Sequence, residues 1–400
     1  MSLHITRKSR AVAILVVLVI ISYWYSNSKI QWIDTLQREH KMVKTYVIQD
    51  ENYASNESSS WSTTLLHFSI IACVDSNKSR DAVSSTSWRR QMRQIEVLFK
   101  SAAVLTSNTI QFHIVSSSFS VYEQITNITT KWPEEYKRKI IFDSWKSVYH
   151  PSDIPSISAF KKCATARLFL PYVLQDLDSV IFVDTDMLFL RPPEALWQIF
   201  KNFTEEQITG MVPSYYLYKK SSFKRKFPTY GKTGLNGGLM LMNLTRMRNF
   251  PKDWLKSIKN SIDQYGKHFY LADQDILVNV FSKDNSKYLN EMSCEWNFRY
   301  RLCRQKRKCK SVDANGIGLL HGNGMSFTRG HSHPFKELFH AWEKYSLRAP
   351  VPKLLEQMVL IFKRIRKRGC GSLQNAEDIF LKGFKTSIDK NPSSDNKTGH

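Results

Sequence analysis

No stretch of this 400-residue chain recurs at a period of about 20–50 residues, which excludes solenoids and propellers. Its six cysteines include no C-x2-C pair, which argues against a structural zinc site. No recognisable DNA-binding motif accompanies the basic residues, and the basic runs are not interleaved with stacking aromatic residues. The sequence therefore predicts neither a repeat protein nor a nucleic-acid partner.

Acidic residues are scarce, because 35 Asp and Glu stand against 58 Lys and Arg, a formal charge of +23. Such an excess attracts polyanions, among them anionic lipid headgroups and nucleotide diphosphates. We interpret the basic runs mainly as solvated faces; they are residues 219–220, 224–226, 299–310 and 363–368. The hydrophobic content of 42% excludes a mostly disordered chain. The length accommodates one α/β domain of about 250–300 residues plus accessory ends.

The N-terminus carries an unbroken apolar run over residues 11–21, preceded by Arg7, Lys8 and Arg10 and followed by aromatic residues at 23–25. This pattern predicts an uncleaved signal-anchor over residues 11–25, with a cytosolic tail over 1–10. A cleaved signal peptide is the alternative, but no small-x-small site follows the run. Because a short span suits the thinner membranes of the early secretory pathway, we expect a type II protein of the Golgi or endoplasmic reticulum membrane.

A luminal address is consistent with the rest of the chain. Residues 26–63 are polar and rich in Ser and Asn, as in a stem that holds a domain away from the bilayer. Six sequons occur, at Asn56, Asn77, Asn127, Asn202, Asn243 and Asn396. The even number of cysteines predicts disulfides among Cys294, Cys303, Cys309 and Cys370, with the pairing open. Cys73 and Cys163 lie in apolar contexts, which favours buried thiols there.

The pattern of apolar residues predicts an α/β fold with a mainly parallel sheet over residues 64–345. Predicted strands and helices alternate along this stretch. We expect strands at 65–74, 109–115, 179–183 and 235–244, and helices at 88–106, 159–174, from 194 onward, 251–265 and 273–281. Residues 346–400 are interpreted as a basic helix, 352–368, followed by a polar tail.

Two acids follow the buried strand at 179–183 directly. Asp184 and Asp186 are two residues apart, so both carboxylates can face one point where the strand ends. Hard oxygen ligands suit Mg²⁺ or Mn²⁺ and a diphosphate. Ligands of open α/β sheets bind at the carboxyl ends of strands, which is where these acids fall. The alternative is a turn Asp followed by a helix cap, but a strand as apolar as residues 179–183 has no fold reason to end in two acids.

Two further groups of residues are candidates for the same site. His321 follows an apolar run in a loop with Gly318, Gly322 and Gly324, where it can reach a metal while the backbone approaches phosphate. Taken alone, such a histidine is more often a satisfied core or turn residue. Asp273 opens a predicted helix, and helix capping explains it without any function.

Together these motifs resemble glycosyltransferase family 8, retaining enzymes with a GT-A fold, and within it the glucoside xylosyltransferases. The similar stretches run in order across the predicted domain: residues 71–73, 99–102, 163–171, 183–192, 230–234, 236–243, 273–275, 294–297 and 320–323. The resemblance implies a transfer of xylose from UDP-xylose to O-linked glucose on EGF-like repeats, in an α1,3 linkage. The implied partners are the UDP-sugar and the O-glucosylated repeat proteins.

The resemblance also implies residue roles. Asp184, Asp186 and His321, with Gly322 beside it, would bind Mn²⁺ and the donor diphosphate, and Arg167 would neutralise donor charge. Asn236 and Gly237 would line the donor sugar, and Asp273 and Gln274 would sit beside the anomeric carbon. Asp75 would contact uridine. The sequence leaves open whether retention uses a nucleophile or front-face attack.

The chain departs from the family pattern at three places, one of which is Gly324, where the glucoside xylosyltransferases show an Arg beside H-G-N. Phe327 stands where many relatives carry a phosphate-binding Lys, and Lys232 and Arg329 are possible substitutes. Leu271 and Ala272 replace a Trp-Gly pair before Asp273. Two alternatives therefore remain at this point: a family 8 transferase that uses UDP-glucose, UDP-galactose or a glucuronosyl donor, and a membrane-tethered sugar- or polyanion-binding ectodomain without turnover.

Overall fold

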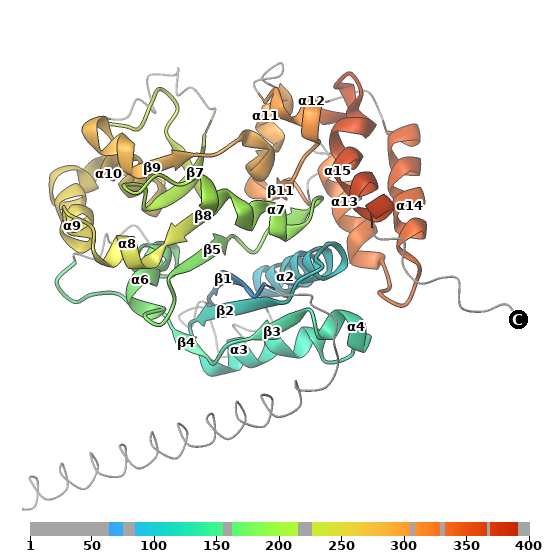
Figure 1. Ribbon diagram of the computed structural model, residues 1–400, viewed down its shortest axis with the longest axis horizontal. Coiled ribbons are helices and arrows are strands. Elements are labelled where there is room, and N and C mark those ends of the chain that lie inside the picture. The colour runs from blue at the N-terminus through green and yellow to red at the C-terminus, as the bar shows by residue number, and fades with distance from the viewer. Residues whose placement is uncertain are drawn as a thin grey trace, which may run out of the picture. The chain divides into compact units, whose positions relative to one another are not determined.

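The computed structural model describes residues 64–74, 85–154, 162–214, 226–304, 309–328, 333–365 and 369–390. Their main sheet has the strand order β3-β2-β1-β5-β8-β7-β9, with β4 pairing beside β2 (Figure 1). Its strands are β1 (Leu66–Ala72), β2 (Ile110–Ser116), β3 (Ile140–Phe142), β4 (Lys146–Ser147), β5 (Ser179–Val183), β7 (Thr209–Pro213), β8 (Leu235–Asn243) and β9 (Leu289–Glu291). Most neighbours pair in parallel, and β8 is antiparallel to both β5 and β7. The predicted α/β class is confirmed.

The first β-α-β unit forms where apolar spacing predicts it. Helix α2 (Thr86–Leu105) begins at Ser85, whose side chain accepts the Trp88 N–H, and it buries an apolar stripe that includes Leu98 and Phe99. The stripe packs on β1 and β2, which pair in parallel along their whole length. Phe99 and Phe112 meet at a ring-centroid distance of 4.5 Å in this core.

A second, three-stranded sheet pairs the strand that follows the acidic turn, residues 184–186, with strands from later in the chain. Its order is β10-β11-β6, where β6 is Met187–Phe189, β10 is Phe298–Arg299 and β11 is Leu319–His321. Strand β6 follows Asp186 directly, and its antiparallel partner β11 sets His321 opposite Met187. The pairing therefore places His321 beside the Asp184–Asp186 turn, across more than 130 residues of sequence.

Helices cover both sides of the sheets. Besides α2 they are α3 (Phe119–Thr126), α4 (Glu134–Lys137), α5 (Lys162–Thr165), α6 (Leu170–Val173), α7 (Pro193–Trp197), α8 (Leu244–Arg248), α9 (Trp254–Tyr265), α10 (Asp273–Val280), α11 (Tyr300–Arg304), α12 (Ser311–Asn315), α13 (His333–Lys344), α14 (Val351–Arg364) and α15 (Ala376–Lys390). Figure 1 shows α13, α14 and α15, in red, side by side. Phe380 and Phe384 of α15 are fully buried, so this helix belongs to the core although its sequence was interpreted as a polar tail.

The prediction of one continuous helix over residues 159–174 is wrong. Its described part consists of α5, a 3-10 turn at Ala166–Phe169, and α6. Pro171 lies in the first turn of α6, where a missing N–H costs nothing, and it could not stand inside one long helix. The break leaves Arg167 on a tight turn instead of a continuous helix face.

All six cysteines form disulfides. The predicted set pairs as Cys294–Cys309 and Cys303–Cys370. The expectation of free thiols at Cys73 and Cys163 is wrong, because these two residues form a third disulfide across 90 residues of sequence. It joins the end of β1 to α5 and so fixes the start of the turn that carries Arg167.

The predicted anchor at residues 11–25 and the stem at 26–63 lie outside the described residues. Among the residues that are described, no helix combines the length and apolar character that crossing a bilayer requires.

Candidate active site

The acidic turn between β5 and β6 is held by backbone hydrogen bonds from two other elements. The Asp184 N–H donates to Gly238 O on β8 (2.8 Å), and the Gly322 N–H donates to Asp186 O (2.7 Å). Between the two acids, Thr185 Oγ1 accepts a hydrogen bond from Gln91 Nε2 of α2 (3.3 Å). Because the backbone is fixed on both sides, the two carboxylates have a defined direction.

Asp184, Asp186 and His321 form a cluster that fits a divalent metal ion. One ligand atom from each of the three lies within 4.8 Å of the others. His321 Nε2 is 3.7 Å from Asp184 Oδ2 and 3.4 Å from Asp186 Oδ1. Gly238 leaves the necessary room, since a Cβ there would lie 2.3 Å from His321 Cε1 and 2.9 Å from Asp184 Oδ2. Two carboxylate oxygens and one imidazole nitrogen are ligand atoms that a divalent metal ion can take.

Arg167 holds two carboxylates from the opposite side. Its Nη2 lies 3.1 Å from Asp184 Oδ1, and its Nε lies 2.9 Å from Asp273 Oδ2. Its Nη1 donates to the Gly237 carbonyl, and the guanidinium covers the Phe182 ring at 4.5 Å. Arg167 therefore bridges the metal cluster and the predicted sugar-binding residues, which meet at the carboxyl end of β5.

A chain of three side-chain amides links the metal cluster to Gln274. His321 Nδ1 is 2.9 Å from Asn297 Oδ1, and Asn297 Nδ2 donates to Asn236 Oδ1 (2.8 Å). Asn236 Nδ2 in turn donates to Gln274 Oε1 (3.1 Å). Asn297 is fully buried, so each of its polar atoms has to find its partner inside the protein.

The charges at this site shift three pKa values. Burial, together with the charge of Asp184, raises the pKa of Asp273 from 3.8 to about 6, although Arg167 opposes the rise. Burial also raises the pKa of Asp186, but the contacts with His321 and Arg167 lower it by more, so the net shift is downward. Burial would lower the pKa of Arg167, but Asp184 and Asp273 raise it. Three acids around one arginine leave an excess of negative charge that a bound cation would balance.

The structure brings most of the predicted site residues together. Asp184, Asp186, His321, Gly322, Arg167, Asn236, Gly237, Asp273 and Gln274 all lie in this network. Asp273 lies in the first turn of α10, after Ala272 at the cap position, and its carboxylate also pairs with Arg167, a contact that helix capping does not explain. Asp75 and Arg329 lie outside the described residues.

Phe327, which stands where relatives carry a Lys, cannot contact a phosphate. Its ring is fully buried, stacks on Phe339 at 4.8 Å, and fills the space beside Gly322, where a Cβ would lie 2.3 Å from the ring. Phe327 therefore packs beside Gly322 and supports the loop that follows His321. Of the two proposed substitutes, Lys232 is solvent-exposed.

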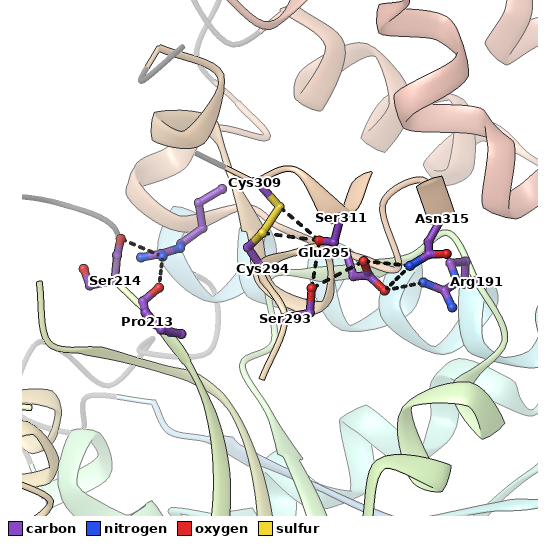
Figure 2. The surroundings of a disulfide bond; sticks show 10 residues. Arg191, Pro213, Ser214, Ser293, Cys294, Glu295, Cys309, Ser311 and Asn315 are labelled. Atoms are coloured by element: carbon purple, nitrogen blue, oxygen red, sulfur yellow. Dashed lines mark hydrogen bonds and ion pairs between the residues drawn. A yellow bond between two sulfur atoms is a disulfide. The ribbon is translucent and has the colours of Figure 1, made fainter. Parts of the chain in front are cut away.

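Sequence reasoning assigned no role to Asn297 or Gly238. Both fall inside stretches that carry the family resemblance, and that was their only signal. Asn297 ends a 3-10 turn, Cys294–Asn297, that is fixed at its start by the Cys294–Cys309 disulfide (Figure 2). In the same turn, the buried carboxylate of Glu295 pairs with Arg191 Nη1 at 2.8 Å and accepts from Asn315, as Figure 2 shows. These contacts hold the backbone that presents Asn297.

Comparisons with known proteins agree with this geometry. The family model for glycosyl transferase family 8 matches residues 46–326. Glucoside xylosyltransferase 2 of Xenopus laevis is 30% identical over 298 residues, covering 70% of this chain and 65% of that protein. Glucoside xylosyltransferase 1 of Gallus gallus is 29% identical over 341 residues, covering 81% and 72% respectively. The match to the Xenopus protein thus spans slightly less than two thirds of its length.

Among solved structures, the galactosyltransferase LgtC in complex with donor and acceptor sugar analogues matches with a TM-score of 0.51 at 18% identity, covering 71% of this chain and 98% of that chain. At this identity the likeness concerns the fold alone. It is a GT-A-like α/β fold, with a mainly parallel sheet and flanking helices.

Proposed function

This chain belongs to glycosyl transferase family 8, and we propose that it transfers xylose from UDP-xylose to O-linked glucose on EGF-like repeats, with retention and an α1,3 linkage. The observation that carries the proposal is the cluster of Asp184, Asp186 and His321 opposite Arg167. The choice of xylose and of a glucoside acceptor is supported by the relatives named glucoside xylosyltransferase.

Asp184, Asp186 and His321 would hold Mn²⁺. When bound, this ion supplies positive charge to the diphosphate that leaves the sugar. Arg167 supplies a second, permanent positive charge from within the protein, and its two ion pairs keep the guanidinium in place before the donor arrives. Fixed charges of this kind stabilise the leaving group without reorganisation.

The sugar of the donor would lie against Asn236, Gly237, Asp273 and Gln274. Gly237 lies beside both charged side chains, since a Cβ on it would be 3.4 Å from Arg167 Nη1 and from Asp273 Oδ2. Asp273 would face the positive charge that develops at the anomeric carbon. We extend the proposal to Asp75 as a uridine contact.

The proposed acceptor chemistry belongs to the secretory pathway. Three disulfides agree with an oxidising compartment. We therefore propose a type II protein of the Golgi or endoplasmic reticulum membrane, anchored by residues 11–25 with its catalytic domain in the lumen.

A donor panel tests the proposed function. The protein is incubated with Mn²⁺, an EGF-like repeat that carries O-linked glucose, and one of four donors: UDP-xylose, UDP-glucose, UDP-galactose or UDP-glucuronic acid. The mass of each product is measured by mass spectrometry. We expect a pentose to be added from UDP-xylose, and nothing to be added to the same repeat without its glucose. Addition of a hexose or of glucuronic acid would replace the donor assignment. Binding of UDP without any transfer would favour the non-catalytic ectodomain.

A further inference from the structure

Asn297 lies between the metal cluster and the sugar-binding residues but would touch neither metal nor sugar. It is fully buried, and its two polar atoms face His321 and Asn236. A buried amide that is satisfied on both sides fixes the direction of its neighbours, because an oxygen accepts and an NH₂ group donates.

Two backbone N–H groups decide the direction of the whole chain of amides. The Gly238 N–H points at one end of the Asn236 amide (3.3 Å), and the Gly237 N–H points at one end of the Gln274 amide (3.4 Å). A backbone N–H can only donate, so both of these ends are oxygens. Asn297 therefore has to present its NH₂ group to Asn236 Oδ1 and its oxygen to His321.

This direction places a proton on His321. Asn297 Oδ1 can only accept, so His321 Nδ1 has to carry a hydrogen and donate it. The lone pair of the neutral imidazole is then on Nε2, the atom that faces Asp184 and Asp186. Hydrogen bonds of this kind set the tautomer and the ring orientation of metal-binding histidines in general.

The other end of the chain fixes Gln274. Its Oε1 accepts from both Asn236 Nδ2 and the Gly237 N–H. Its Nε2 has no hydrogen-bond partner among the described residues, so two N–H donors remain for a ligand. Gln274 therefore offers hydrogen-bond donors to a donor sugar, and its oxygen is not available as a nucleophile.

We propose that Asn297 is a positioning residue: its oxygen turns His321 Nε2 toward the metal, and its NH₂ group, together with the Gly238 N–H, holds the Asn236 amide that contacts Gln274. The proposal rests on the proposed function only in that the site binds a metal and a UDP-sugar. It does not depend on which sugar is transferred.

Two variants separate the contact of Asn297 with His321 from its contact with Asn236. Asn297→Ala removes both hydrogen bonds of the amide. Asn297→Asp keeps an oxygen that accepts from His321 Nδ1 but has no hydrogen to donate to Asn236. Asn285→Ala is the matched control, since the Asn285 amide also accepts (from Lys252) and donates (to Val280 O), on a segment that contains no predicted site residue. Thermal unfolding establishes that each protein is folded.

The first measurement is the tautomer of His321, read from long-range ¹H–¹⁵N spectra of the metal-free protein at a pH where the imidazole is neutral. We expect Nδ1 to be protonated in the wild type and in Asn297→Asp, and a mixture or the Nε2 form in Asn297→Ala. A wild type protonated at Nε2, or an unchanged spectrum in Asn297→Ala, would overturn the proposal.

The second measurement is Mn²⁺ affinity in the presence of UDP, by calorimetry, together with turnover of the donor. Loss of a hydrogen bond to a metal ligand weakens metal binding by about 10–100-fold, which we expect for Asn297→Ala. Asn297→Asp should keep the metal affinity and lose about tenfold in kcat, the size of one lost hydrogen bond. Equal loss of metal affinity in both variants would show a general structural role and contradict the proposal. An absence of xylose transfer in all proteins would leave the spectra and affinities interpretable, and would count against the proposed function alone.

Discussion

Replacement of Asp273 by Asn tests the electrostatic balance of the site. Asp273 is 6% exposed and faces Arg167, with the charge of Asp184 nearby. Burial, with Asp184 adding to it, raises the pKa of Asp273 from 3.8 to about 6. Arg167 therefore only partly offsets the cost of a buried carboxylate, and the ionised form of Asp273 destabilises the metal-free fold.

The pKa values of Asp273 in the folded and in the unfolded chain determine the size and sign of its contribution to stability. The folded-state pKa lies above that of the unfolded chain, so the fold favours the protonated acid. This contribution to stability is complete below the unfolded pKa and is lost as the pH rises through about 6. A difference of about 2 pKa units corresponds to about 3 kcal/mol. Asn has no carboxylate to ionise, so the variant should lack this pH dependence.

Urea unfolding of the metal-free protein at several pH values between about 4 and 8 measures the difference between variant and wild type. We expect the free energy of unfolding of Asp273→Asn, relative to that of the wild type, to rise by about 3 kcal/mol from acid to neutral pH. The transferase activity of the variant should be lower than that of the wild type. Asp263→Asn is the control, because Asp263 pairs with Lys259 at the exposed surface, where such a pair is worth less than about 1 kcal/mol. A stability difference that does not change with pH would refute the assignment of a raised pKa to Asp273.

Two further substitutions probe the same network. Arg167→Met leaves two carboxylates, those of Asp184 and Asp273, without their buried partner and should lower the free energy of unfolding by about 3–5 kcal/mol in urea, with part of the loss recovered when Asp273→Asn is added; full stability of the single variant would contradict this. Gly238→Ala places a methyl group against His321 and Asp184 and should reduce Mn²⁺ affinity at least tenfold by calorimetry, whereas Gly266→Ala, whose Cβ would make an ordinary 3.5 Å contact with Ile262, should leave it unchanged.

The strand that carries the acidic turn could be predicted from sequence because its signal is local. Ser179–Val183 is a short apolar run that ends in two acids, and the structure gives β5 the same bounds. The first β-α-β unit is equally local, since the helical spacing of apolar residues before Leu105 defines α2. In both cases neighbouring residues contain the information.

The remaining features depend on contacts between distant segments. Cys73 and Cys163 are in apolar surroundings whether free or paired, and only the fold brings them together across 90 residues. The same holds for Asn297, because its role comes from contacts with Asn236 and His321. Helix α15 is different, because Phe380, Phe384 and Ile388 recur at the i, i+4 spacing of a helix, and this local signal was enough to predict a buried face.

The proposed function depends on a metal site, formed by Asp184, Asp186 and His321, that binds the donor diphosphate. Calorimetric titration of UDP into the protein with and without Mn²⁺ tests it most directly, in the wild type, in Asp184→Asn with Asp186→Asn, and in the surface control Asp263→Asn. We predict that Mn²⁺ tightens UDP binding at least tenfold in the wild type and in the control, and has no effect in the double variant. Equal UDP affinity with and without Mn²⁺ in the wild type, or a Mn²⁺ effect that survives the double substitution, would contradict the assignment of the metal site.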